Sequence, residues 1–167
     1  MIGNKIVHYY VEGECEQKLV RTLIDDFKLL PPGTIKVLNI KQKLIPKSIL
    51  INLHPGSYIV FIFDTDVDNY EFLIENRKIL EKMKAKIKII LLPQVKNLED
   101  ELKRSCNIRQ IRELTHSRSD KDFKRDFIKA GNLMSLMKHA GFDYSLLWEQ
   151  KMPDSINIYE NGKKHLI

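Results

Sequence analysis

Three aspartates alternate directly after the most apolar run of the chain. Residues 58–63 read Tyr-Ile-Val-Phe-Ile-Phe, and Asp64, Asp66 and Asp68 follow them. Alternate residues of an extended segment share a side, so the carboxylates of Asp64 and Asp66 can converge on one point. Two like charges that lie close together repel each other, and a shared cation relieves that repulsion. Hard oxygen ligands of this kind suit Mg²⁺ or Mn²⁺. The alternative interpretation is an acidic turn exposed to solvent.

A second acidic cluster follows the first apolar segment of the chain. Glu12 comes directly after Val11, and Gly13 lets the backbone turn tightly at this point. A carboxylate between a strand and a turn costs desolvation free energy unless it has a partner, so Glu12 is a candidate for the same cation. Glu16 falls in the first turn of a predicted helix, where the helix dipole favours a negative charge. The alternative interpretation is that Glu14 and Glu16 are only ordinary acids of a helix start.

The elements that must position these acids alternate between strand and helix. Strands are predicted at residues 6–11, 34–40, 58–63 and 87–92, with helices from residue 14 to the Pro31-Pro32-Gly33 stop and at 46–53 and 70–84. This order predicts an α/β fold with a mainly parallel four-stranded sheet flanked by helices. Functional groups of such sheets gather beyond the carboxyl ends of the strands, which is where both acidic clusters lie.

The second half of the sequence predicts a helical and basic extension. Helices are expected at residues 98–106, 120–129, 132–139 and 142–151, and a terminal strand at 156–159. The formal net charge is +6, and basic residues concentrate between positions 103 and 129. This clustering favours a surface that binds nucleic-acid phosphates through Arg118, Lys121, Lys124 and Arg125. The alternative is a basic surface that only keeps the protein soluble.

The spacing of the acids resembles a known family. A strand ending in Val11-Glu12-Gly13-x-x-Glu16, followed two strand–helix units later by Asp64-x-Asp66-x-Asp68, is similar to the Toprim domain over residues 5–105. Topoisomerases, bacterial primases, overcoming-lysogenization-defect nucleases and RloB-like proteins share this domain. The resemblance is to the nuclease-like branch and implies a Toprim-type, Rossmann-like catalytic core at residues 1–105. Residues 106–167 would be a helical extension packed on that core.

The resemblance also implies roles for individual residues. Glu12, Asp64 and Asp66 would be catalytic and would bind Mg²⁺ or Mn²⁺. Glu16 and Asp68 would be further metal ligands, and Glu99 is the preferred candidate for the carboxylate that this branch carries after the fourth strand. The implied activity is that of a metal-dependent endonuclease or phosphodiesterase acting on DNA or RNA. Such a protein would serve as a phage-defence effector, with an ATPase or another defence protein as partner and a homodimer as one open assembly.

Two other functions remain open on the sequence. The first is a non-catalytic or partner-controlled subunit that binds nucleic acid. The second is a phosphatase of the haloacid-dehalogenase type, whose nucleophile lies in an Asp-x-Asp at a strand end. That family has the motif on its first strand, whereas a complete strand–helix–strand–helix segment precedes Asp64 here.

Composition points to the cytoplasm. Cys15 and Cys106 form no Cys-x-x-Cys pair, and the first residues run straight into a strand without the features of a signal peptide. Two distant cysteines of this kind are typical of reduced thiols. No apolar run approaches the roughly 20 residues that a membrane span needs, so no membrane contact is predicted.

Overall fold

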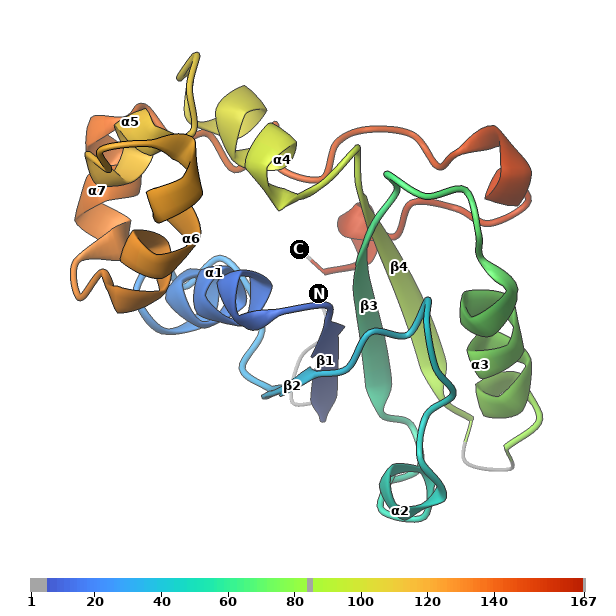
Figure 1. Ribbon diagram of the computed structural model, residues 1–167. Coiled ribbons are helices and arrows are strands. Elements are labelled where there is room, and N and C mark those ends of the chain that lie inside the picture. Colours follow the sequence, from blue (N-terminus) through green and yellow to red (C-terminus); the bar gives the residue numbers. More distant parts are fainter. Residues whose placement is uncertain (1–5, 84–85, 167) are drawn as a thin grey trace.

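A four-stranded, all-parallel sheet flanked by helices forms the centre of the protein in a computed structural model that describes residues 6–83 and 86–166 (Figure 1). The strands lie in the order β2-β1-β3-β4. They comprise β1 (Val7–Val11), β2 (Thr34–Val37), β3 (Tyr58–Asp64) and β4 (Lys88–Gln94). The predicted α/β fold class is confirmed, and the arrangement is consistent with a Rossmann-like fold. Because β1 lies between β2 and β3, the residue that follows β1 is placed next to those that follow both neighbours.

One face of the sheet is covered by α1 (Glu14–Asp25) and α4 (Leu98–Ser105). The sheet contributes side chains such as Val60, Ile62 and Leu92, and α1 contributes Leu19 and Leu23. These side chains are fully buried, and the alternation of strand residues between the two faces explains which of them point this way. Asp64 and Gln94 continue the same alternation, so their side chains leave the sheet on the face of α1 and α4.

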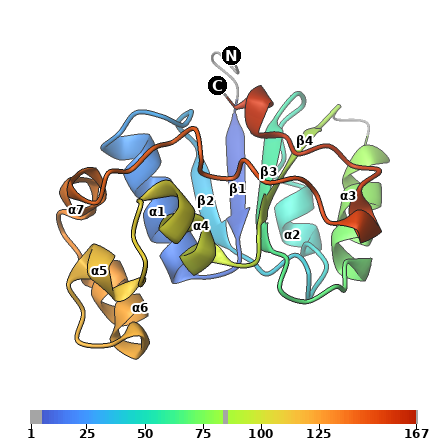
Figure 2. The same ribbon diagram turned by 90° about the horizontal axis from the view of Figure 1, so that it is seen from above.

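The opposite face packs against α2 (Lys47–Leu50) and α3 (Glu71–Glu81). Phe61 and Phe63 of β3 meet Leu73 and Leu80 of α3 in a second buried cluster. Figure 2, the view from above, shows α3 and α2 on the other side of the strands from α1 and α4. The continuous apolar run of β3 is therefore covered on both faces, as its composition predicts.

Three further helices lie beside α1. They are α5 (Arg112–Thr115), α6 (Asp120–Lys129) and α7 (Leu133–His139), and Figures 1 and 2 both place them beyond α1 from the sheet. Phe123 and Phe127, one helical turn apart on α6, are buried in the same core cluster as side chains of α1 and the sheet. The short helix α5 is absent from the sequence predictions.

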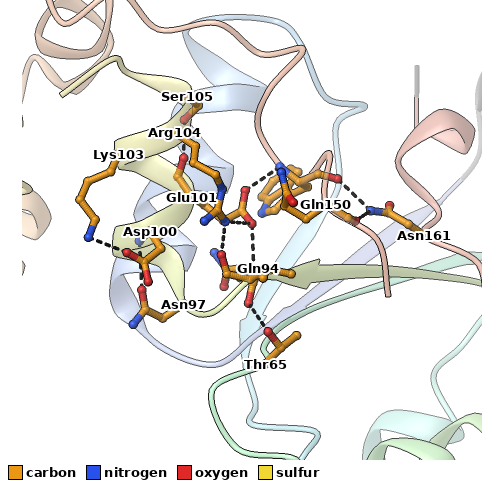
Figure 3. Close-up of polar contacts among 12 residues, drawn as sticks. Thr65, Gln94, Asn97, Asp100, Glu101, Lys103, Arg104, Ser105, Gln150 and Asn161 are labelled. Carbon is orange, nitrogen blue, oxygen red and sulfur yellow. Dashed lines mark hydrogen bonds and ion pairs between the residues drawn. The ribbon is translucent and has the colours of Figure 1, made fainter. Parts of the chain in front are cut away.

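A buried carboxylate joins β4, α4 and the chain that follows α7 (Figure 3). Glu101 is fully buried, and its Oε1 accepts from the Val95 backbone N–H at 2.9 Å and from Arg104 Nη2 at 2.6 Å. Its Oε2 accepts from the Trp148 backbone N–H at 2.9 Å. Arg104 also donates to the Val95 carbonyl. Glu101 thus joins the last segment of the chain to α4 and to the end of β4.

The segment after α7 differs most from the predictions. Residues 142–151 form turns instead of the predicted helix. The Trp148 N–H donates to Glu101, and the Tyr144 carbonyl accepts from Lys163 Nζ at 3.0 Å, so the hydrogen bond from residue 148 to residue 144 that a helix requires is replaced at both ends.

The predicted strand at 156–159 is also wrong. The chain forms the 3₁₀ turns η1 (Asp154–Ile156) and η2 (Lys163–His165), and Ile158 is 82% exposed. Its contact with the sheet comes later, where the Gly162 N–H donates to the Leu91 carbonyl of β4 at 2.9 Å. Figures 1 and 2 show this segment crossing from the region of α7 to that of α3 and returning to β4.

Other predicted elements are present with shorter bounds. The second strand ends at Val37, the second helix covers only Lys47–Leu50, and α3 ends at Glu81; the predicted end of that helix, Lys84, lies outside the described residues. The division into residues 1–105 and 106–167 stays a prediction. Within residues 6–83 and 86–166, no helix combines the length and the apolar character needed to cross a bilayer.

Candidate functional site

Glu12 connects the ends of three strands. It follows β1, and its Oε1 accepts from the Asp64 backbone N–H, at the end of β3, at 3.2 Å. Its Oε2 accepts from Asn39 Nδ2, in the loop after β2, also at 3.2 Å. The strand order places β1 between the other two, which brings together acids that are 52 positions apart in the sequence. The predicted proximity of Glu12 and Asp64 is therefore present in the fold.

Asp64 carries the most perturbed carboxyl group of the site. It ends β3 in register with Gln94 of β4, and its buried Oδ1 has no hydrogen-bond partner among the residues that the structure describes. Burial is the main cause that raises the pKa of Asp64 to about 8, and the nearby carboxylates of Glu12 and Glu16 add to it. A buried carboxyl oxygen without a partner costs free energy unless a proton or a cation satisfies it. A proton or a bound cation would therefore stabilise the Asp64 side chain in this position.

Burial also raises the pKa of Glu12, and it does so against the Asp64 N–H and the charge of Lys41, which both favour the ionised form. The pKa of Glu16 is raised by burial too, with the charge of Glu99 adding to it. A raised pKa in several neighbouring acids is expected where carboxylates share a site with restricted access to water.

Glu16 lies in the first turn of α1 and is only 8% exposed. Its carboxylate points back toward the turn that precedes the helix. It comes so close to Gly13 that a Cβ added to this glycine would lie 3.1 Å from Glu16 Oε2. Its charge adds to the raised pKa of Asp64, and the charge of Glu99 adds to the raised pKa of Glu16 itself. Burial of this kind goes beyond a solvated acid at a helix start.

Glu99 is joined to the basic helix α6. Its Oε1 pairs with Lys124 Nζ at 3.2 Å, and this carboxylate is the main reason why the pKa of Lys124 is raised. Glu16, Glu99 and Lys124 line one shallow pocket of about 190 Å³ together with Gly13 and Cys15. The structure therefore brings a predicted phosphate-binding lysine next to two predicted metal ligands.

Asp66 and Asp68 point to other partners in this structure. Asp66 is exposed, and its Oδ1 lies 4.0 Å from Lys41 Nζ. Asp68 Oδ1 accepts from Ser155 Oγ at 2.5 Å, which ties the loop to the segment of η1. β3 ends at Asp64, and the charge of Asp66 still adds to the raised pKa values of Asp64 and Glu12.

A pocket of about 210 Å³ opens on the side of Asp66. It is lined by Glu12, Asp66 and Lys41 and by three carboxamides and an apolar residue of the neighbouring loops: Asn39, Gln42, Asn69 and Val67. Asn39 and Lys41 contact the site but are absent from the sequence predictions. Their signal was their position after β2, at the same edge of the sheet as the acids.

The predicted phosphate-binding residues are all exposed on or before α6. Arg125 is paired with Asp122 at 3.0 Å and with Asp126 at 2.9 Å. Across the part of the chain that the structure describes, Arg118 and Lys121 form no ion pair within 4.0 Å, so their charges are available to an anionic partner.

The carboxylate oxygens of the site are ligands of the type that a hard divalent cation prefers, but their positions in this structure do not form a complete set of ligands. Among residues 6–83 and 86–166, no three His, Cys, Asp or Glu side chains already converge in a way that could hold a metal ion. The unpartnered Oδ1 of Asp64 and the close contact of Glu12 with the same residue nevertheless fit Mg²⁺ or Mn²⁺, whose ligands are carboxylate oxygens.

Comparison with known proteins assigns no family to this chain, so a function can be inferred only from the contacts described above. A scan of protein-family models, a search of curated proteins and a search of solved structures each gave no significant match to this chain.

Proposed function

We propose that the protein is a metal-dependent nuclease of Toprim type. The observation that carries the proposal is the contact between Glu12 Oε1 and the Asp64 N–H. With it goes the buried Oδ1 of Asp64, which has no hydrogen-bond partner within residues 6–83 and 86–166. Acids from the ends of two adjacent parallel strands thereby share one edge of the sheet, which is where α/β proteins bind their ligands.

Glu12, Asp64 and Asp66 are the residues proposed to hold Mg²⁺ or Mn²⁺, with Glu16 and Glu99 as neighbouring carboxylates. Asp66 is exposed, lines the same pocket as Glu12, and its charge adds to the raised pKa of Glu12. A bound divalent ion would polarise a phosphate and lower the pKa of a water molecule that attacks it. Glu12, which contacts both Asp64 and Asn39, has the alternative role of moving a proton to or from that water.

The basic residues of α6 are proposed to hold the sugar–phosphate backbone. Lys124 reaches Glu99 at 3.2 Å, so a strand that lies across the start of α6 toward Lys124 passes next to the acids. Contacts with phosphates give affinity without reading base edges. We propose that this activity serves phage defence together with an ATPase or another partner protein.

The activity is tested with purified protein in Mg²⁺ or Mn²⁺ on plasmid DNA and on RNA. We expect the wild type to cut at least one of them and the Asp64→Ala, Asp66→Ala variant to lose about a thousandfold or more in rate, since loss of charge stabilisation in a transition state has effects of this size. The Asp26→Ala variant is the control, because Asp26 is exposed at the end of α1. Equal cutting by wild type and double variant would show contamination and remove the proposal.

A second candidate function is binding of nucleic acid without cleavage. The observation that favours it is that the described acids do not yet converge as a set of three ligands. The same experiment separates the two functions, because binding of DNA or RNA that persists in Mg²⁺ without any cleavage supports the second.

Substitution of Arg118 and Lys121 tests the binding surface. We expect the Arg118→Ala, Lys121→Ala variant to bind all sequences more weakly and to reduce the slope of log K against log salt by about 2, since each lost phosphate contact contributes about one. Fluorescence anisotropy at several salt concentrations measures this. The control is Lys78→Ala, Lys82→Ala, whose lysines are exposed at the end of α3 on the opposite face of the sheet. Equal slopes for both variants would place the binding surface elsewhere.

A further inference from the structure

Lys41 is a buried lysine inside the candidate site. It lies in the loop after β2 and is 9% exposed. Its Nζ donates to the Asp64 carbonyl at 2.6 Å and to the Val67 carbonyl at 2.8 Å. The ammonium lies 4.9 Å from the centre of the Tyr70 ring, which adds a favourable contact between a cation and an aromatic face. Burying an ammonium group is costly, and these contacts are what compensate for it.

The two carbonyls that Lys41 binds are the first and last of the segment Asp64-Thr65-Asp66-Val67. A single ammonium therefore closes the turn on which both central aspartates stand. The same turn is also bound to the end of β4 and the residues that follow it. The N–H of Thr65, within the turn, donates to the Gln94 and Lys96 carbonyls at 3.0 and 2.8 Å. Lys41 and the chain after β4 thus determine the path of this turn.

The backbone around Lys41 also holds Glu12. The Lys41 N–H donates to Asn39 Oδ1 at 3.1 Å, and Asn39 Nδ2 donates to Glu12 Oε2 at 3.2 Å. One short segment after β2 therefore contacts the glutamate of β1 and the aspartate turn of β3 at the same time.

We propose that Lys41 is a positioning residue of the metal site, which aligns the Asp64–Val67 turn with Glu12 through its carbonyl contacts. The inference rests on the proposed function, since it concerns the same acids. The proposed effect of Lys41 on metal affinity is opposite to the effect that its positive charge alone would have. A cation near a metal site weakens the binding of a second cation, whereas a cation that orders the ligands strengthens it.

This opposition makes the role measurable without an activity assay. The Lys41→Met variant keeps the aliphatic length and removes the charge and the donors. If Lys41 positions the turn, Mn²⁺ binds Lys41→Met about tenfold more weakly than wild type. If Lys41 acts only through its charge, Mn²⁺ binds this variant more tightly. Isothermal titration of each protein with MnCl₂ distinguishes the two signs.

Two further variants complete the experiment. Lys43→Met is the control, because Lys43 is exposed two residues away, and its affinity for Mn²⁺ is expected to stay within about twofold of wild type. Lys41→Gln keeps an amide donor without the charge, and we expect it to recover part of the affinity lost in Lys41→Met. Where Lys41→Met does not fold, Lys41→Gln is compared directly with wild type, and weaker Mn²⁺ binding supports the inference.

The outcomes separate this inference from the function on which it rests. Binding of Mn²⁺ by wild type, with equal or tighter binding by the folded Lys41 variants, overturns the positioning role and leaves the nuclease proposal in place. Absence of Mn²⁺ binding by wild type itself contradicts the metal site and the nuclease proposal together.

Discussion

The Asp64→Asn variant is expected to unfold less readily than wild type at pH 8 in EDTA, by about 2 kcal/mol, and to lose the stabilisation that Mg²⁺ confers. Asn is nearly the same size as Asp and carries no charge. The substitution therefore removes the cost of ionising a buried carboxyl group while it leaves the packing at the end of β3 in place. A residue that is unfavourable for stability and needed for metal binding is typical of a functional site.

The expected dependence on pH follows from the raised pKa of Asp64. Burial is its first cause and the nearby carboxylates its second, and together they bring the value to about 8 in the folded protein. Between pH 4 and pH 8 the folded state holds a proton that the unfolded state has released, so stability decreases as pH rises. The loss is absent below pH 4 and complete above pH 8. Asp64→Asn is expected to flatten this slope, and the raised pKa values of Glu12 and Glu16 leave a smaller residual slope.

Urea denaturation at pH 5, 6.5, 8 and 9 measures both effects. Asp26→Asn is the matched control, because Asp26 is exposed at the end of α1 and belongs to no proposed metal site. With Mg²⁺ at about 100 times its dissociation constant, wild type should gain about 2.7 kcal/mol at pH 8 and Asp64→Asn almost nothing. A wild-type stability that rises from pH 5 to pH 8, or an equal Mg²⁺ effect in both proteins, would contradict the assigned environment of Asp64.

Removal of the Glu101 side chain is expected to cause the largest loss of stability, about 3–5 kcal/mol. The fully buried carboxylate accepts three hydrogen bonds, from Val95, Arg104 and Trp148, and Glu101→Ala leaves these donors and the charge of Arg104 without their partner (Figure 3). An unsatisfied buried donor alone costs roughly 1–3 kcal/mol. Because Trp148 begins the segment that returns to β4, we expect this segment to detach before the sheet unfolds.

Hydrogen exchange and urea denaturation of Glu101→Ala test this expectation. The control is Asp100→Ala, one position earlier on α4, where the carboxylate is partly exposed and pairs with Lys103 on the same helix. Its loss should stay below about 1 kcal/mol, as for other exposed pairs. Faster exchange at the Gly162 amide, which donates to Leu91, is expected only in Glu101→Ala. Equal losses in the two variants would mean that Glu101 does not join these elements.

The order of strands and helices in the first half could be predicted from the sequence because it depends on local patterns. The continuous apolar run of β3 and the change of period at Glu14 are properties of neighbouring residues. The positions of Glu12 and Asp64 at strand ends follow from the same patterns. The sequence by itself therefore determined the fold class and the edge of the sheet on which these two acids stand.

The shape of the last segment could not be read in this way. The helix predicted at residues 142–151 fails because its Trp148 amide binds Glu101, which lies 47 positions away. The contacts of Asp66 and Asp68 depend on distant residues too, since Lys41 and Ser155 approach these aspartates from other parts of the chain. A local pattern reports which residues share a side of an element, and it contains no information on distant groups that compete for the same atoms.

Only the tertiary structure shows which other residues connect Glu12 to the aspartates after β3. The order β2-β1-β3-β4 places the loop after β2 beside Glu12, so that Asn39 and Lys41 connect the glutamate to the aspartate turn. Sequence periodicity determined on which edge the carboxylates stand, because side-chain direction repeats along each strand. Strand order and loop path determined which atoms they contact, because those depend on the free energy of the whole packed chain.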